Sequence, residues 1–239
     1  HQGVIQKYYL SVNGGTGVAT TKTYDGTLDA EITQEPSLVG VVAGDSVTLH
    51  TTAAYETDGA ATGKKVWVYY NIDGDDTANY VPPQTTLATD QGVINKMQLS
   101  VSGTTVASKS YDGTTSATLS NNGTLEDVVD GDTVTFTAAA SYATKAAGSS
   151  KEATVVYTID GADKNNYLAP ANGSLTGTIH KRLLTAKDID VTGSKEYDGT
   201  RNTSITACTI NNLVAGDMVT VQTTATFDTK QAGSWKSIT

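Results

Sequence analysis

The 239-residue chain contains one cysteine, four prolines and few basic residues. The single Cys208 excludes an internal disulfide, and we interpret it as a small buried hydrophobe. Lys and Arg total 16 against 25 Asp and Glu, and no cationic cluster is present. Because phosphate binding needs clustered cations, the sequence predicts no nucleic-acid partner. No apolar run approaches about 18 residues, so we expect no membrane span in this segment.

Histidine is scarce as well. The three histidines, His1, His50 and His180, occupy unrelated positions without the spacing of a metal site. No Ser, His, Asp set and no pair of carboxylates can be assigned to one surface. An enzyme with duplicated units is expected to keep its catalytic set in one unit, whereas the polar residues of this chain recur in every unit. The sequence therefore predicts that the protein is not an enzyme.

What the chain does contain is a six-residue phrase, Lys-x-Tyr-Asp-Gly-Thr, written three times. Tyr111 lies 87 residues after Tyr24, and Tyr197 lies 86 residues after Tyr111. A Val-x-Gly-Asp sequence follows each phrase, which indicates duplication of a whole unit. The recurring residues of the phrase are Lys22, Tyr24, Asp25, Gly26, Lys109, Tyr111, Asp112, Gly113, Lys195, Tyr197, Asp198 and Gly199.

The spacing predicts repeats at 8–95, 96–181 and 182–239, the third incomplete at its C-terminal end. Residues 1–7 (HQGVIQK) match QGVINK at 91–96, so we interpret them as the closing strand of a preceding repeat. Two explanations are open for the incompleteness of the third repeat. Either the chain is a segment of a longer array, or a neighbouring molecule completes the third sheet by adding a strand. We favour the segment, because HQGVIQK is too short to replace both missing strands.

Apolar residues alternate with threonine after each Gly-Asp, as in the predicted strands around 47–55, 134–142 and 219–227. A period of two predicts half-buried strands, and the Asp-Gly and Gly-Asp pairs between them are turn formers. We therefore expect an all-β protein of tandem, antiparallel, immunoglobulin-like β-sandwich repeats in an elongated array. A β-grasp-like unit is the alternative. It requires a helix, for which residues 125–130 and their counterparts are the candidates.

The ordered motifs resemble the YDG repeat of bacterial cell-surface adhesins and haemagglutinin-like proteins. In the second repeat these motifs are Lys109 to Thr114, Gly131 to Val134, Gly148 to Lys151, Asp160 to Tyr167 and Thr178 to Thr185. The resemblance covers nearly the whole chain and is specific as a fixed order. It implies a tandem β-rich module of a secreted surface protein, in a family without established catalytic residues.

From the repeats and this resemblance we expect a structural or adhesive segment located outside the cell, at a bacterial surface. It would act as a stalk, or as a subunit of an extracellular filament or surface layer. Neighbouring repeats or like subunits are the expected partners, through contact or strand addition, together with host or matrix glycans.

Outward aromatic rings suggest an alternative function. If Val66, Val68 and Tyr70 face the core, Trp67 and Tyr69 must face outward. Adjacent outward rings can stack on sugars, which would make the chain a carbohydrate-binding module. A cross-strand aromatic pair is the structural interpretation of the same residues.

Two further hypotheses concern polar residues. The acidic Asp73, Asp75 and Asp76 could hold calcium as the one candidate cofactor, although the second repeat loses one acid there, and an ordinary turn is the alternative. An amide crosslink could join Lys22 to Asn79 and Lys109 to Asn166, with Asp25 or Asp112 as proton shuttle. Capping hydrogen bonds by the asparagines are the alternative to this crosslink. The aspartates of the phrase are interpreted as turn formers, with a surface ion pair to the preceding Lys as the alternative.

Overall fold

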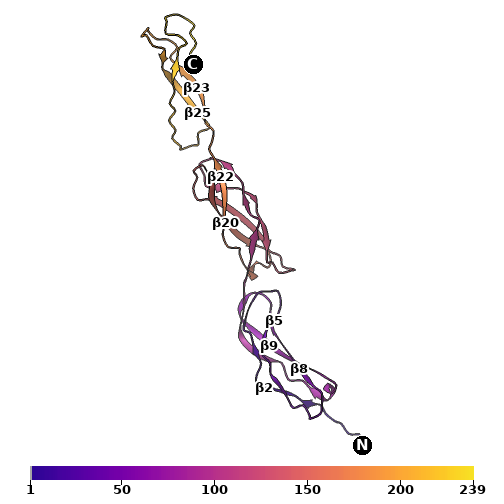
Figure 1. Ribbon diagram of the computed structural model, residues 1–239. Coiled ribbons are helices and arrows are strands. Elements are labelled where there is room, and N and C mark those ends of the chain that lie inside the picture. Colours follow the sequence, from indigo (N-terminus) through magenta and orange to yellow (C-terminus); the bar gives the residue numbers. More distant parts are fainter. Residues whose placement is uncertain (1) are drawn as a thin grey trace. The chain divides into compact units, whose positions relative to one another are not determined.

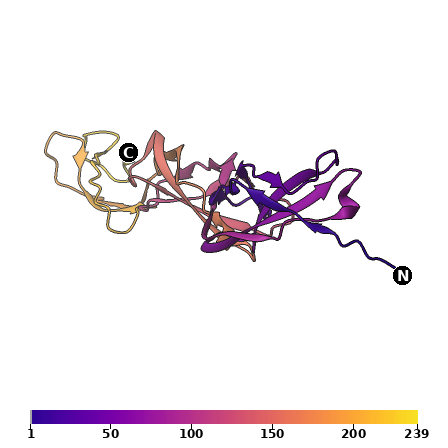
Figure 2. The same cartoon turned by 90° about the horizontal axis from the view of Figure 1, so that it is seen from below.

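A computed structural model describes residues 2–239, and His1, the first residue of the predicted segment 1–7, lies outside the described residues. The prediction of an all-β protein is confirmed, because the described residues form strands joined by turns, with two 3-10 helices of three residues each (Figures 1 and 2). Within residues 2–239, no helix is long and apolar enough to cross a membrane.

The chain forms two compact units. One consists of residues 2–104, 122–138 and 157–172, and the other of residues 105–121, 139–156 and 173–239. Each unit therefore contains a boundary between consecutive sequence repeats. The first unit holds the boundary between the first and second repeats, and the second unit holds the boundary between the second and third.

The first repeat is built around a five-stranded sheet with the order β4-β11-β9-β8-β5. Three two-stranded ladders, β1-β10, β2-β7 and β3-β6, accompany it. The sequence predicts antiparallel strands throughout, and this is wrong for two pairs. Strand β1 pairs in parallel with β10, and β4 pairs in parallel with β11. The elements are β1 (Tyr8–Tyr9), β2 (Ser11–Asn13), β3 (Gly17–Val18), β4 (Thr21–Thr23), β5 (Asp29–Ala30), β6 (Ile32–Gln34), β7 (Ser37–Val39), β8 (Thr48–Tyr55), β9 (Ala61–Asp73), η1 (Thr77–Asn79), β10 (Tyr80–Val81) and β11 (Thr86–Asn95).

The predicted alternation explains which face of this sheet is buried. Along β9, Val66, Val68 and Tyr70 are buried, and they pack with Tyr55 of β8 and Ile94 of β11 in one core cluster. Burying an aliphatic side chain of this size contributes about 1.5–3 kcal/mol, so each of these positions on the central strands stabilises the sheet.

The second repeat uses the same order of elements, with a sheet β15-β22-β20-β19-β16 and a core of Tyr142, Ala153 and Ile179. Residues 125–130, the helix candidate of the β-grasp alternative, begin in strand β18 and contain no helix. The elements are β12 (Met97–Gln98), β13 (Ser100–Ser102), β14 (Thr105–Val106), β15 (Lys109–Ser110), β16 (Ser116–Ala117), β17 (Leu119–Asn121), β18 (Thr124–Glu126), β19 (Thr135–Tyr142), β20 (Gly148–Asp160), η2 (Lys164–Asn166), β21 (Tyr167–Leu168) and β22 (Gly173–His180).

The third repeat contains β23 (Thr185–Val191), β24 (Asn202–Thr203), β25 (Ile205–Asn211) and β26 (Ala225–Thr226). The strand predicted over 219–227 is wrong for its first part, because only residues 225–226 form a strand and Val219 and Val221 are exposed. In the first repeat the matching strand β8 pairs over its whole length with residues 66–73 of β9, whereas β26 pairs with β24 at two positions. Without that pairing, alternation alone does not hold a strand.

Two smaller expectations, for Cys208 and for the N-terminal residues, can also be compared with the structure. Cys208, interpreted as buried, lies half-buried in β25. Residues 2–7, interpreted as a closing strand, take no strand conformation and are exposed (Figure 2).

Candidate functional site

The recurring phrase folds into a turn held together by its own lysine. Lys22 Nζ donates to Asp25 Oδ1 at 2.7 Å and to the carbonyl and hydroxyl oxygens of Thr27, and Asp25 Oδ1 accepts from the Thr27 backbone N–H. Lys109 and Asp112 form the same ion pair at 2.8 Å, as do Lys195 and Asp198. Both interpretations of the phrase aspartate, as a turn former and as the partner of the lysine, are therefore confirmed in all three copies.

This arrangement keeps the aspartates ionised. Hydrogen bonds from Lys109 and then Thr114 lower the pKa of Asp112 to about 2, and those from Lys195 and Thr200 do the same for Asp198. Burial alone would raise the pKa of Asp25, but the hydrogen bonds from Lys22 and Thr27 outweigh it and hold that pKa below its usual value. The turn is therefore charged at every pH above about 4.

The Val-x-Gly-Asp sequence forms a second turn, which faces a tyrosine of its own repeat. In the second repeat the Asp132 N–H donates to the Val129 carbonyl, and the Val129 N–H donates to the Tyr167 hydroxyl at 3.0 Å. The Tyr167 hydroxyl in turn donates to Asp132 Oδ2 at 2.5 Å. Val42, Asp45 and Tyr80 repeat this pattern in the first repeat.

The two turns meet where the first repeat contacts the second. Tyr24 of the first phrase donates its hydroxyl to Asp132 Oδ2 at 2.9 Å, so one carboxylate oxygen accepts from two tyrosines. The Tyr24 and Tyr167 rings pack edge to face at a centroid distance of 5.4 Å. A Cβ on Gly26, whose φ is +75°, would lie 2.7 Å from Val129 Cγ1. This Tyr–Asp junction joins residues 108 positions apart in the sequence.

The junction recurs between the second and third repeats. Tyr111 donates to Asp217 Oδ1 at 3.0 Å, and a Cβ on Gly113, with φ at +80°, would lie 2.7 Å from Val214 Cγ1. A cavity of about 420 Å³ opens here, with Leu184 among its lining residues.

Both junction tyrosines of the first unit are held neutral. Burial, and then the hydrogen bond to Asp132, raise the pKa of Tyr167 to about 12. The same two causes raise the pKa of Tyr24 still further above its usual value of 10. A neutral hydroxyl is the form that donates to the carboxylate, so the junction favours the protonated tyrosines over the whole neutral range.

The residues of the carbohydrate hypothesis do lie on one face of β9. Trp67 is half-buried and Tyr69 is 41% exposed, and both alternate with the buried Val66, Val68 and Tyr70. Trp67 pairs with Ala54 of β8 and Leu87 of β11, so aliphatic neighbours flank the ring on both sides.

The structure gives the residues of the crosslink hypothesis separate hydrogen-bond partners. Lys22 and Lys109 bond to the aspartates and threonines of their own turns. Asn166 Oδ1 accepts from the Ala60 backbone N–H of the first repeat at 2.9 Å, which is a contact between repeats and not the local capping bond named as the alternative. The crosslink stays a prediction, and an intact mass lacking the loss of one ammonia per pair would contradict it.

The acidic residues of the calcium hypothesis act as turn formers. Asp73 Oδ1 accepts from the Gly74 N–H, and Asp76 Oδ2 accepts from the Ser46 N–H at 2.7 Å. In the part of the chain that the structure describes, no three His, Cys, Asp or Glu residues are grouped to hold a metal. Calcium also stays a prediction, and a rise in the melting temperature on adding it would support it.

Sequence reasoning missed the partner of the phrase tyrosine. The sequence shows that Tyr24 and Tyr111 recur, but it predicts only turns for the aspartates of Val-x-Gly-Asp. The one hint in the sequence is that the phrase tyrosine and the Val-x-Gly-Asp aspartate both recur in every repeat. The pairing could not be read from it, because each tyrosine bonds to the aspartate of the next repeat.

The fold and the site thus define the class of protein. It is a tandem β-rich repeat protein in which consecutive repeats make the same contact. A family model described as the YDG domain matches residues 6–87, 95–174 and 180–239, and the chain belongs to this family. No curated protein and no solved structure matches the chain. The domain limits 1–7, 8–95, 96–181 and 182–239 stay predictions.

Proposed function

We propose that the chain is a structural and adhesive repeat segment of a secreted bacterial surface protein, built from immunoglobulin-like sandwich units. It acts as a stalk or as a subunit of an extracellular filament or surface layer. The observation that carries the proposal is the Tyr–Asp junction, because it uses the most regular residues of the sequence to join one repeat to the next.

The composition of the junction supports a mechanical role. The junction consists of a neutral tyrosine, an ionised aspartate and a glycine packed against a valine side chain. The two polar groups bond to each other, and this contact joins the repeats. Hydrogen bonds to a charged acceptor are worth about 1.5–3 kcal/mol each, enough to hold neighbouring repeats in register when reinforced by ring packing. Stability in such arrays is the sum of the repeats and their interfaces.

Two measurements test the proposal. Antibodies raised against the chain should label intact cells of the source organism without permeabilisation. Electron microscopy of proteins that contain one, two and three copies of the chain in tandem should show rods that lengthen by a constant increment. Labelling that requires broken cells, or particles that grow in all dimensions, would contradict the proposal.

The exposed face of β9 favours a second candidate, a carbohydrate-binding module centred on Trp67 and Tyr69. A glycan array would then show binding that is lost in Trp67→Ala. Val156, the exposed counterpart of Tyr69 in the second repeat, provides the matched control, because Val156→Ala should leave glycan binding unchanged. Equal binding by all three proteins, or none, removes this candidate.

A further inference from the structure

The chain enters and leaves the first repeat through strands that run in the same direction. Strand β1 pairs in parallel with β10, with Tyr8 opposite Tyr80, and β4 pairs in parallel with β11, with Lys22 opposite Ile94. Both pairs keep one register, so residues 8–23 and 80–95 form two runs that lie side by side. The chain therefore enters the repeat at the start of one run and leaves it at the far end of the other.

Backbone hydrogen bonds extend these parallel pairs beyond their ladders. The bonds run from the Leu10 N–H to the Val81 carbonyl at 3.0 Å, from the Val93 N–H to the Thr20 carbonyl at 2.8 Å, and from the Tyr24 N–H to the Asn95 carbonyl at 2.8 Å. Leu10 and Tyr24, which directly follow β1 and β4, are both buried. Sliding one run along the other therefore breaks both sets of bonds and pulls two buried side chains out of the core.

The second repeat has the same two kinds of pair. Strand β12 pairs in parallel with β21, and β15 pairs in parallel with β22. Leu99, which directly follows β12, is buried, and its N–H donates to the Leu168 carbonyl at 3.1 Å, in the same way as Leu10 in the first repeat. The parallel pairs are therefore a property of the repeat and not of one copy.

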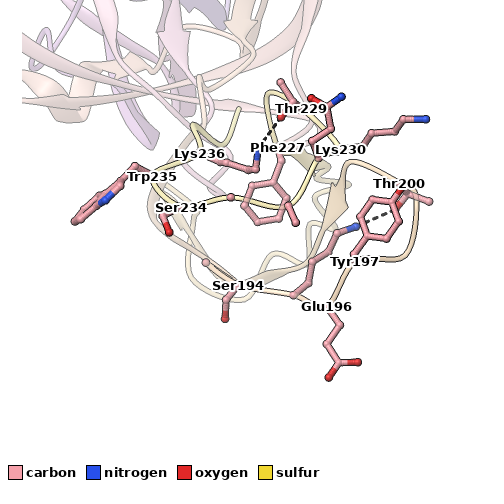
Figure 3. Close-up of a pocket in the computed structure, with 15 residues that line it drawn as sticks. Ser194, Glu196, Tyr197, Thr200, Phe227, Thr229, Lys230, Ser234, Trp235 and Lys236 are labelled. Atoms are coloured by element: carbon pink, nitrogen blue, oxygen red, sulfur yellow. Dashed lines mark hydrogen bonds between the residues drawn. The ribbon is translucent and has the colours of Figure 1, made fainter.

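The lysine of the phrase lies inside one of these pairs. Lys22 is the middle residue of β4, and besides its ion pair its Nζ donates to two oxygens of Thr27 and to the Asp29 carbonyl at 3.0 Å. Asp29 begins β5, the strand at the opposite edge of the same sheet. The Lys22 side chain thus ties the two edge strands to each other. Figure 3 shows the corresponding bond in the third copy of the phrase, where Thr200 Oγ1 accepts from Lys195 Nζ at 2.9 Å.

The direction of a force decides how strongly a parallel pair resists it. When the two strands are pulled along their axes in opposite directions, all the hydrogen bonds between them are loaded together and must break in one step. When the strands are pulled apart from one end, the bonds are loaded one after another and each breaks at a lower force. Forced unfolding is governed by the unfolding barrier and not by the free energy of unfolding, so one pair can be strong in one direction and weak in another.

We propose that the two parallel pairs of a repeat, β1-β10 with β4-β11 in the first, form a mechanical clamp that resists stretching of the chain, and that the phrase lysine anchors this clamp. Tension on the chain pulls residues 8–23 toward the entry of the repeat and residues 80–95 toward its exit, which loads both pairs in shear. The proposal rests on the proposed function as a stalk or filament subunit, and it names the force that each repeat is built to withstand.

Single-molecule pulling of the first repeat in two directions tests the proposal. Full-length chains carry Cys208→Ser and two new cysteines as attachment points, either Lys7→Cys with Lys96→Cys or Thr23→Cys with Lys96→Cys. The side chains of Lys7, Thr23 and Lys96 are all exposed. The 7–96 chain loads both parallel pairs in shear, whereas the 23–96 chain peels β4 from β11 at the end where Thr23 lies opposite Asn95.

We expect the first repeat to rupture at a force about twofold higher or more in the 7–96 chain than in the 23–96 chain at the same pulling speed. The extension gained, about 3.5 Å for each residue between the attachment points, identifies the first repeat as the part that opens. Urea midpoints of the two chains before attachment are the control for their stability. Equal rupture forces, or a higher force in the 23–96 chain, would overturn the clamp.

Lys22→Met and Lys109→Met in the 7–96 chain form a matched pair of variants. Both lysines make the same bonds to the aspartate and threonine of their own turns, but only Lys22 lies between the attachment points. We expect Lys22→Met to lower the rupture force by about a third, because charge-assisted hydrogen bonds that hold β4 are lost, and Lys109→Met to leave it unchanged. Equal rupture forces in the two variants would overturn the anchoring role of the phrase lysine.

The results of pulling are independent of the tests of the surface role. A first repeat that ruptures at the same force in both directions would overturn the clamp, while labelling of intact cells and rods seen by microscopy would still support a stalk or filament. Labelling that requires broken cells would contradict the surface role, and the ratio of the two rupture forces would not change.

Discussion

Asp132 is the residue at which two sequence motifs of consecutive repeats become one contact. Its Oδ2 accepts from Tyr24 of the preceding repeat and from Tyr167 of its own repeat. An ionised acceptor strengthens both hydrogen bonds, and the partly buried position makes an unmatched carboxylate costly. Removing one hydroxyl group that donates to Asp132 should therefore measurably lower the free energy of unfolding.

Replacing Tyr24 by Phe removes one hydroxyl and keeps the ring. We expect the free energy of unfolding to fall by about 1.5–3 kcal/mol, since Asp132 loses a charge-assisted hydrogen bond at a partly buried position. Urea denaturation followed by tyrosine fluorescence measures this change. The matched control is Tyr197→Phe, because Tyr197 is 67% exposed and we expect a loss of less than about 0.5 kcal/mol. Equal losses in both variants would contradict the junction.

Alkaline pH should weaken the same contact. Tyrosine in the unfolded chain ionises near 10, whereas the pKa of Tyr167 is about 12 in the fold and that of Tyr24 is raised further. Groups with raised pKa values contribute stability that is complete below pH 10 and is lost as the pH rises through the folded values. Denaturation midpoints measured between about pH 8 and 11.5 should fall above pH 10, and the fall should be shallower in Tyr24→Phe. A pH dependence identical in the two proteins would exclude these tyrosines as its source.

At the scale of the element, strand β11 decides whether a repeat has a closed core. It joins the phrase strand β4 to the long strand β9, and it buries Ile94 between them. The close approach of its backbone to β9 leaves no room for a side chain at Gly92.

We expect Gly92→Ala to destabilise the protein by about 1–3 kcal/mol, because the added methyl group meets the Lys64 carbonyl oxygen and the Tyr55 ring. Thermal unfolding by circular dichroism measures the loss. Gly148→Ala in β20 is the control, since its Cβ would meet only the Lys151 side chain at 3.7 Å, and we expect a change of less than about 0.5 kcal/mol. A neutral Gly92→Ala would show that β11 lies farther from β9 than in this structure.

At the scale of the whole molecule, the two Tyr–Asp junctions share no residue. Each lies within one compact unit, Tyr24 and Asp132 in the first and Tyr111 and Asp217 in the second. A chain in which repeats contact only their neighbours behaves as a sum of repeats and interfaces.

The double variant Tyr24→Phe, Tyr111→Phe should therefore lose the sum of the two single losses, within about 0.5 kcal/mol. Denaturation of the wild type, both single variants and the double variant completes the cycle. A coupling energy above about 1 kcal/mol would mean that the junctions belong to one cooperative core and not to independent interfaces.

The sequence predicted most of what is local. The alternation in 47–55 and 134–142 predicted strands β8 and β19, because a period of two matches the pleat and does not depend on the partner strand. The same alternation in 219–227 predicted a strand that the structure forms only at 225–226. The difference is that a strand needs a hydrogen-bonded neighbour, which alternation does not encode.

By itself the sequence determined the repeat, the all-β fold, the family and the turn in which Lys22, Asp25 and Thr27 bond to each other, since all of these depend on residues close together in the chain. The tertiary structure alone decided that Tyr24 bonds to Asp132 and that β4 and β11 run in parallel. These contacts join residues that are distant in the sequence, and which residues meet follows from how the sheets place chain segments, which the spacing of motifs along the sequence does not specify.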